Sequence, residues 1–279
     1  MAEWSIVAPG EDVARIDELV YAAPDPRLAG KVLTYTAHDY THPEPISWQV
    51  IALGAVTVTI DIDRPVRLVG AESMPVSPVL GLRDRPVTIT QSGHAHGITI
   101  GLSPAGAYAL FGLPLSEIAN AAIGLGDLVG SRACHLADQL AHTPTWAERF
   151  RIVDRHLLAW SQDGPRLARP VHGAWHRLMS SHGRVRIGAL ADEIGWTRQH
   201  LVSRFRGQIG LTPKTVARVA RLHRATTLIN DPGALSWADI AHDSGYADQS
   251  HLNRDFRDLT GSTPTQTVLN EPPTFVHAR

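Results

Sequence analysis

Cysteine, lysine and long apolar runs are all scarce in this chain of 279 residues. Cys134 is the single cysteine, which excludes an internal disulfide and any Cys-x-x-Cys metal or redox motif. A redox-sensing role for this one thiol stays open as an alternative. No apolar run reaches the roughly 18–20 residues that a membrane helix needs, and the first residues lack the basic and apolar segments of a signal peptide. We therefore expect a cytoplasmic protein that does not contact a membrane.

The two halves of the chain carry opposite charge, although the formal net charge is only −1. Counting Lys and Arg against Asp and Glu gives −7 for residues 1–164 and +6 for residues 165–279. Such an asymmetry is expected when one domain meets a polyanion and the other does not. The length of the chain also suits two domains, each with a core of its own.

The basic half contains the same motif twice. The first copy reads Ala191-Asp192-Glu193-Ile194-Gly195-Trp196, then His200-Leu201, Arg204-Phe205 and Gly210-Leu211-Thr212-Pro213. The second reads Ala241-His242-Asp243-Ser244-Gly245-Tyr246, then His251-Leu252, Asp255-Phe256 and Gly261-Ser262-Thr263-Pro264. The offset between the copies grows from 50 to 51 at the turn, so the second turn is one residue longer. A short amphipathic helix, a Gly turn and a helix with a polar face are typical of helix-turn-helix DNA readers.

The apolar spacing predicts two such units, at about 187–209 and 237–260, joined by a helix that begins at Thr212-Pro213 and ends near Ile229. Thr197 and Asp248 are expected to cap the second helix of each unit, and Ser236 to open a capping box. Seventeen residues at about 1.5 Å each give a spacer of roughly 25 Å. That length is of the order needed to hold two readers in successive major grooves, about 34 Å apart.

One face of each second helix is left for the solvent once the apolar residues turn inward. Gln side chains can pair with adenine edges, and Arg with guanine or phosphate. Nine basic residues also fall between 184 and 224, where few acidic ones oppose them. Among them we assign six to the phosphates of DNA: Arg198, Arg204, Arg206, Lys214, Arg218 and Arg221.

Residues from about 167 to 269 resemble the DNA-binding domain of the AraC/XylS-type transcription regulators. The resemblance rests on the Gly-aromatic turns, both Gly-x-Thr-Pro elements and the run from Gly245 to Phe256. It also rests on the Phe in the second helix of each unit, which we call the reader helix. It implies a protein that binds double-stranded promoter DNA and regulates transcription, as activator or repressor. It further implies base contacts by seven outward residues: Gln199, Val202, Ser203, Gln249, Ser250, His251 and Arg254.

The acidic half shows a different pattern, with short alternating or apolar runs separated by turn residues. Strands are expected at 48–53, 56–60, 86–90 and 97–102, and helices at 105–111, 116–122, 131–140 and 146–161. Strands at this spacing suggest a small antiparallel barrel or sandwich. The fold class is therefore α+β, with an antiparallel β-barrel and trailing helices followed by an all-α domain with two helix-turn-helix units.

This order of elements resembles the cupin-like sensor domains of the same family. Three segments resemble an actinobacterial subgroup with such domains: Ala23–Arg27, Gly81–Pro86 and Leu102–Tyr108. The resemblance implies a small effector and dimer contacts in the first half, so we expect a homodimer. We place the sensor or dimerisation domain at 1–163 and the DNA-binding domain at 166–270, with Gly164-Pro165 as the linker.

His94-Ala95-His96 is the candidate metal pair, because alternate residues of an extended strand can face one ion. A metal cupin also needs a carboxylate a few residues later and a further His, and no Glu follows His96. We therefore read the pair as turn histidines and expect no metal, no cofactor and no enzymatic activity. Two alternatives remain open: a metal-dependent cupin-type enzyme fused to a DNA reader, and a regulator whose first half only dimerises.

Overall fold

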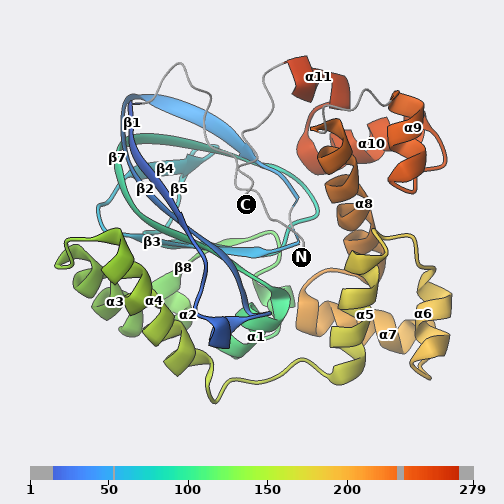
Figure 1. The fold of residues 1–279 in the computed structure, drawn as a ribbon, viewed down its shortest axis with the longest axis horizontal. Coiled ribbons are helices and arrows are strands. Elements are labelled where there is room, and N and C mark those ends of the chain that lie inside the picture. The colour runs from blue at the N-terminus through green and yellow to red at the C-terminus, as the bar shows by residue number, and fades with distance from the viewer. Residues whose placement is uncertain (1–14, 53, 231–235, 270–279) are drawn as a thin grey trace.

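The computed structural model describes residues 15–52, 54–230 and 236–269 (Figure 1). Leu53 of the first predicted strand, and residues 1–14, 231–235 and 270 of the predicted domains, lie outside this range. An antiparallel sheet forms the first half, and helices form the second half. Within the described residues, no helix is long and apolar enough to cross a bilayer.

In the described part of the chain the sheet has eight strands, and all of their pairings are antiparallel. They are β1 (Arg15–Ala22), β2 (Val32–Val50), β3 (Val56–Asp61), β4 (Val66–Val69), β5 (Glu72–Ser73), β6 (Pro78–Leu80), β7 (Val87–Leu102) and β8 (Ala122–Gly124). The strand order is β1-β2-β7-β3-β6-β8, and β4 pairs with both β7 and β5. The predicted antiparallel sheet is confirmed. The sheet curves strongly (Figure 1). It does not close into a complete barrel, because β1 and β8, the outermost of the described strands, do not pair with each other.

Helices cover one face of the curved sheet (Figure 1). They are α1 (Pro104–Phe111), α2 (Leu125–Val129), α3 (Arg132–Ala141) and α4 (Trp146–Ser161), with short 3-10 turns η1 (Pro26–Leu28) and η2 (Leu115–Glu117). Tyr35 of β2 is fully buried against α4, where its ring stacks on Phe150 at 5.7 Å. Its hydroxyl donates a 2.8 Å hydrogen bond to Asp154. Pairing with β7 is regular from Thr34 to His42, and side chains alternate along this part of the strand, so Thr36, His38 and Tyr40 face the opposite way.

Two sequence predictions in this half are wrong. The strands expected at 86–90 and 97–102 are one continuous strand, β7, and His94-Ala95-His96 lies inside it and not in a turn. Gly93, with φ of +85°, is accommodated within β7 where the β2 register shifts between His42 and Ile46. The helix expected at 116–122 is only the 3-10 turn η2, followed by edge strand β8, which pairs with β6.

The second half consists of seven helices between residues 169 and 269, counted over the described part of the chain. They are α5 (Arg169–Ser180), α6 (Ile187–Glu193), α7 (Arg198–Ile209), α8 (Pro213–Ile229), α9 (Trp237–Asp243), α10 (Gln249–Thr260) and α11 (Pro264–Leu269). Figure 1 shows α8 as a long strut with α5, α6 and α7 at one end and α9, α10 and α11 at the other.

Two hydrophobic clusters hold the molecule together, and their boundary does not follow the predicted domain border. The larger cluster runs from the sheet through α4 into α5, α6 and α7 and the first turns of α8. The smaller one joins the later part of α8 to α9 and α10, and Ala52, just after β2, is its one member from the first half among the described residues. The first reader unit therefore shares its core with the sheet half, while the second has a core almost of its own.

Candidate functional site

The two helix-turn-helix units have the same local geometry. Gly195 and Gly245 both have positive φ, +69° and +81°, which glycine adopts without steric cost. In each unit the following aromatic N–H donates a 2.9 Å bond to an alanine carbonyl, from Trp196 to Ala191 and from Tyr246 to Ala241. These bonds end the first helix and set the angle of the second.

Each reader helix is capped in the same way at both ends. The side chains of Thr197 and Asp248 accept bonds from the backbone N–H of His200 and His251, as predicted. Gly210 and Gly261 end the helices in the left-handed conformation, with φ of +93° and +80°. Ser236 and Asp239 form the predicted capping box at the start of α9. The repeat in the sequence is thus a repeat in the structure, with the longer second turn between α9 and α10.

The outward faces of α7 and α10 carry the residues proposed for base contacts. Leu201, Phe205, Leu252 and Phe256 are buried, which fixes the opposite face of each helix toward the solvent. Of the proposed base-contact residues, five are exposed: Gln199, Ser203, Gln249, Ser250 and Arg254. Val202 and His251 are half-buried, and the His251 ring packs edge-on against Tyr246 at 5.3 Å. These two therefore offer less surface to a DNA base.

The six cations proposed for phosphate contact fall into two groups. Arg198, Arg204, Arg206 and Lys214 are exposed. Arg218 and Arg221 instead point into the domain. Arg218 forms ion pairs with Asp255 at 2.9 Å and Asp258 at 2.8 Å, and Arg221 lies 3.7 Å from Asp255. The Asp255 carboxylate thus turns inward toward α8.

Arg218 and Arg221 thus hold α10 against α8, and we no longer assign them to phosphate. Asp255 is 7% exposed at its side chain, so its charge depends on these partners. Arg221 also donates a 3.1 Å bond to the carbonyl of Gly183 and lies over the Tyr246 ring. The network joins α8, α10 and the loop before α6 in one arrangement.

We expect Arg218→Met to lower the free energy of unfolding by about 1–3 kcal/mol. The buried Asp255 would lose its closest cation, but the loss is tempered because the Arg218 side chain is 26% exposed and Arg221 remains. Urea unfolding of the full chain measures it. Exposed Arg204→Met is the matched control, with an expected change within about 0.5 kcal/mol but weaker DNA binding. Equal stability of both variants would contradict the structural role of Arg218 and favour its assignment to a phosphate contact.

Hydrogen bonds between the two reader units were not predicted from the sequence. The Arg184 guanidinium donates hydrogen bonds to the carbonyls of His242 and Asp243, at the end of α9. These partners are 58 and 59 residues away, and no local pattern marks such a pair. Together with Arg221, Arg184 fixes how the first unit sits relative to the second.

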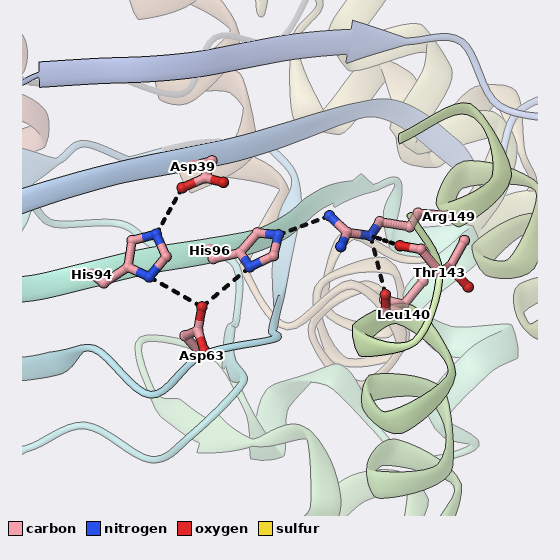
Figure 2. Close-up of polar contacts among 7 residues, drawn as sticks. All are labelled: Asp39, Asp63, His94, His96, Leu140, Thr143 and Arg149. Atoms are coloured by element: carbon pink, nitrogen blue, oxygen red, sulfur yellow. Dashed lines mark hydrogen bonds and ion pairs between the residues drawn. The ribbon is translucent and has the colours of Figure 1, made fainter. Parts of the chain in front are cut away.

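The candidate metal pair lies in a polar cluster at the sheet surface, shown in Figure 2. His94 is bonded on both ring nitrogens, to Asp39 at 2.7 Å and to Asp63 at 3.1 Å. The Nδ1 atom of His96 also lies 3.1 Å from Asp63, and its Nε2 atom lies 2.7 Å from a guanidinium nitrogen of Arg149. Arg149 in turn donates to the carbonyls of Leu140 and Thr143, which connects the sheet to α3 and α4.

This cluster does not fit a metal. An arginine is always a donor, so Nε2 of His96 must accept and its lone pair is already used. A metal at that nitrogen would also lie beside the fixed positive charge of Arg149. No group of three or more His, Cys, Asp or Glu side chains with metal-binding geometry occurs in residues 15–52, 54–230 and 236–269.

A cavity of about 1400 Å³ lies between the sheet and the helices of the second half. Its sheet side is lined by residues of β2, β3, β4 and β7, and its helical side by α5 and α8. Trp175 and Met179 of α5 and Leu222 of α8 belong to the helical wall. The sequence did not indicate this cavity, because its walls come from segments that are far apart in the chain.

Two family models match the chain. Residues 190–269 match a helix-turn-helix domain, which spans both reader units. Residues 21–124 match a domain of unknown function, DUF6597, which covers most of the sheet. No curated protein sequence matches the chain.

Several solved structures are similar in fold. ToxT from Vibrio cholerae bound to an unsaturated fatty acid is 11% identical, with 92% of this chain and 100% of that chain covered and a TM-score of 0.48. The C-terminal domain of AraT, a response regulator from Geobacillus stearothermophilus, is 18% identical over 38% of this chain and 89% of that one, with a TM-score of 0.36. The xylose-binding transcription activator XylR is 23% identical over 38% of this chain and 28% of that one, with a TM-score of 0.32.

The matched helix-turn-helix domain and the duplicated reader geometry point to the same assignment. Each unit has a glycine turn, a capped reader helix and an exposed polar face above a buried Phe. The positive charge of the second half and its repeated motif both suit contact with DNA. Residues 190–269 therefore belong to a helix-turn-helix domain with two reader units, and they resemble the DNA-binding domain of the AraC/XylS-type transcription regulators.

Proposed function

We propose that α7 and α10 enter successive major grooves on one face of promoter DNA. The observation that carries this proposal is the pair of identically capped reader helices with exposed Gln and Arg side chains. Gln199, Ser203, Gln249, Ser250 and Arg254 are the proposed base contacts, with Val202 and His251 at their edge. Arg198, Arg204, Arg206 and Lys214 are the proposed phosphate contacts, which would make binding fall steeply with salt.

A small effector in the cavity between the sheet and the helices would control this binding. The cavity volume, about 1400 Å³, is above the usual range of roughly 300–1,000 Å³ for ligand sites, so a drug-sized molecule fits. Because sheet and reader domain both line it, a ligand there touches both. A ligand that binds one arrangement of the two halves better than another shifts the balance between them.

Two contacts connect the sheet half, which lines the cavity, to the two reader helices. The N–H of Ala52, just after β2, donates a 2.9 Å bond to the carbonyl of Leu259 in α10. Gly210, at the end of α7, packs against the carbonyl of Leu115 in η2, and a Cβ at this glycine would approach that oxygen to 2.7 Å. A shift of the sheet would therefore be felt at the carboxyl end of both reader helices.

Filling the cavity tests the effector part of this proposal. Thr57 of β3 lines the cavity and is half-buried, so Thr57→Trp would place bulk where a ligand would sit. We expect its affinity for cognate DNA to change by about 5–150-fold, the range of a typical allosteric coupling. Fluorescence anisotropy with labelled DNA measures it, and Thr57→Val is the matched control. Unchanged DNA affinity in a folded Thr57→Trp protein would favour a first half that only dimerises.

The domain limits 1–163 and 166–270, with reader units at about 187–209 and 237–260, and the homodimer remain proposals. Support for the limits comes from the extended segment between α4 and α5. The shared core of the sheet and α7 implies that the two domains are not independent in stability. Sedimentation of the full chain tests the dimer.

A further inference from the structure

The sheet wall of the cavity carries a row of three threonines. Thr36 of β2 pairs with Thr99 of β7, and Thr99 pairs with Thr59 of β3. Residues opposite one another in antiparallel strands have side chains on the same face. All three line the cavity, and the hydroxyls of Thr59 and Thr99 are 3.4 Å apart. The row is a neutral, hydroxyl-bearing strip across three neighbouring strands.

His38 lies two residues after Thr36 on β2 and adds a buried imidazole to the cavity wall. His38 is paired with Gly97, which has no side chain, so the ring is not crowded from that side. His38 lines the cavity, is 7% exposed, and its Nε2 atom has no hydrogen-bond partner among the described residues. Burial, and then the charge of Arg67, lowers the pKa of His38 to about 4, so the ring is neutral at pH 7.

Among the described residues of the sheet wall the one cation, Arg67, is already neutralised. Arg67 of β4 donates to Asp61 at 2.8 Å and to the side-chain oxygen of Gln91 at 2.7 Å. Both members of this ion pair are buried, with side-chain exposures of 8% and 1%. Gln91 also donates to the Tyr40 hydroxyl at 3.3 Å, which leaves the Tyr40 proton able to donate toward the cavity. The described sheet wall thus offers donors and acceptors without net charge.

A charged ligand group would be penalised at this wall. A carboxylate beside Arg67 would compete with Asp61 and leave a buried excess of negative charge, which is costly without a partner. An ammonium group would meet the same difficulty with opposite sign, because Asp61 is not among the described residues that line the cavity and its Oδ2 atom already accepts from Arg67 and from the N–H of Ser77. The opposite, helical wall does contain a half-buried cation, Arg224 of α8.

Outside the polar rows the cavity is mainly apolar. Its remaining lining includes Leu33, Val50, Ile51, Trp175, Met179 and Leu222. A ligand that satisfies both parts has a polar end in the sheet and a hydrophobic body between the sheet and the helices.

We propose that the cavity binds an uncharged, amphipathic molecule whose hydroxyl or carbonyl oxygen lies against Thr36, Thr59, Thr99 and His38. The proposal rests on the effector role given to the cavity above and specifies the ligand class. The threonine row and the imidazole supply both donors and acceptors, so a hydroxyl that both donates and accepts suits them best.

Three fluorescent probes of one shape test this class on the full chain: 1-pyrenemethanol, 1-pyrenecarboxylate and 1-pyrenemethylammonium, titrated at pH 7.5. We expect the alcohol to bind about tenfold or more tightly than either ion, since only the ions bring an unpaired charge to the sheet wall. Thr99→Val keeps the shape and removes one hydroxyl, and it should weaken alcohol binding by about 2–10-fold with little effect on the ions. Thr36→Val is the second variant if Thr99→Val does not fold.

The outcomes separate the ligand class from the effector role. Tighter binding of the carboxylate, through Arg67 or Arg224, would overturn the uncharged class while leaving a ligand cavity. Equal binding of all three probes, unchanged in both valine variants, would also overturn it. If none of the probes binds, the amphipathic ligand class is overturned, while the effector role is decided separately by the DNA affinity of Thr57→Trp. DNA binding, measured on the same samples, is independent of these results.

Discussion

Phe256→Ala should lower the free energy of unfolding of the second reader unit by about 3–5 kcal/mol. Phe256 is 1% exposed and lies in the smaller of the two hydrophobic clusters, among residues of α8, α9 and α10. Truncating its ring leaves a cavity that this small core cannot easily fill. Because the cluster is nearly separate from the sheet half, the effect should stay local and abolish binding by α10.

Hydrogen–deuterium exchange read by mass spectrometry measures this prediction region by region. In Phe256→Ala, protection should fall in α9 and α10 and persist in β2, β7 and α4. Phe205→Ala is the matched comparison, because Phe205 occupies the same place in α7 but belongs to the larger cluster. Its loss of protection should extend beyond the first reader unit into the sheet half. The same pattern of loss in both variants would contradict the division into two cores.

Gln249→Ala and Arg254→Ala should each weaken binding to the cognate DNA site by about 1–3 kcal/mol, or roughly 5–150-fold. Both side chains are exposed on α10, whose orientation is fixed by buried Leu252 and Phe256. A good bidentate contact discriminates one base from another, whereas affinity for random DNA comes mostly from phosphates. Non-specific binding should therefore change little.

Anisotropy titrations on cognate and random duplexes at one fixed salt concentration measure both quantities. Arg151→Ala is a charge-matched control for Arg254→Ala, because Arg151 is exposed on α4 in the sheet half. It should change neither affinity. Equal losses on cognate and random DNA in the α10 variants would show that these residues do not read bases.

Predictions that depend on neighbouring residues agree with the structure. Caps at Thr197, Ser236 and Asp248 were predictable because a side chain and a backbone N–H within three residues decide them. The inward Phe205 and Phe256 followed from helical periodicity, which tertiary packing reinforces.

Predictions that depend on distant pairing did not agree. Ser92-Gly93 has the composition of a turn, yet long pairing with β2 carries β7 straight through it. Residues 116–122 have a helical pattern, but β8 is completed by hydrogen bonds to β6, whose paired residues lie 42 to 46 positions earlier in the chain. The inward turn of Arg218 toward Asp255, and the cavity shared by both halves, likewise depend on contacts that no sequence window contains.

The central claim is that two reader helices in one chain recognise a defined DNA sequence. Selection of genomic DNA fragments by the purified full chain, at two salt concentrations, tests it most directly. We predict a recurrent motif with two half-elements about one helical turn, or roughly 34 Å, apart, which persists at the higher salt while total binding falls. Fragments without any shared motif, lost smoothly as salt rises, would contradict sequence-specific reading by α7 and α10.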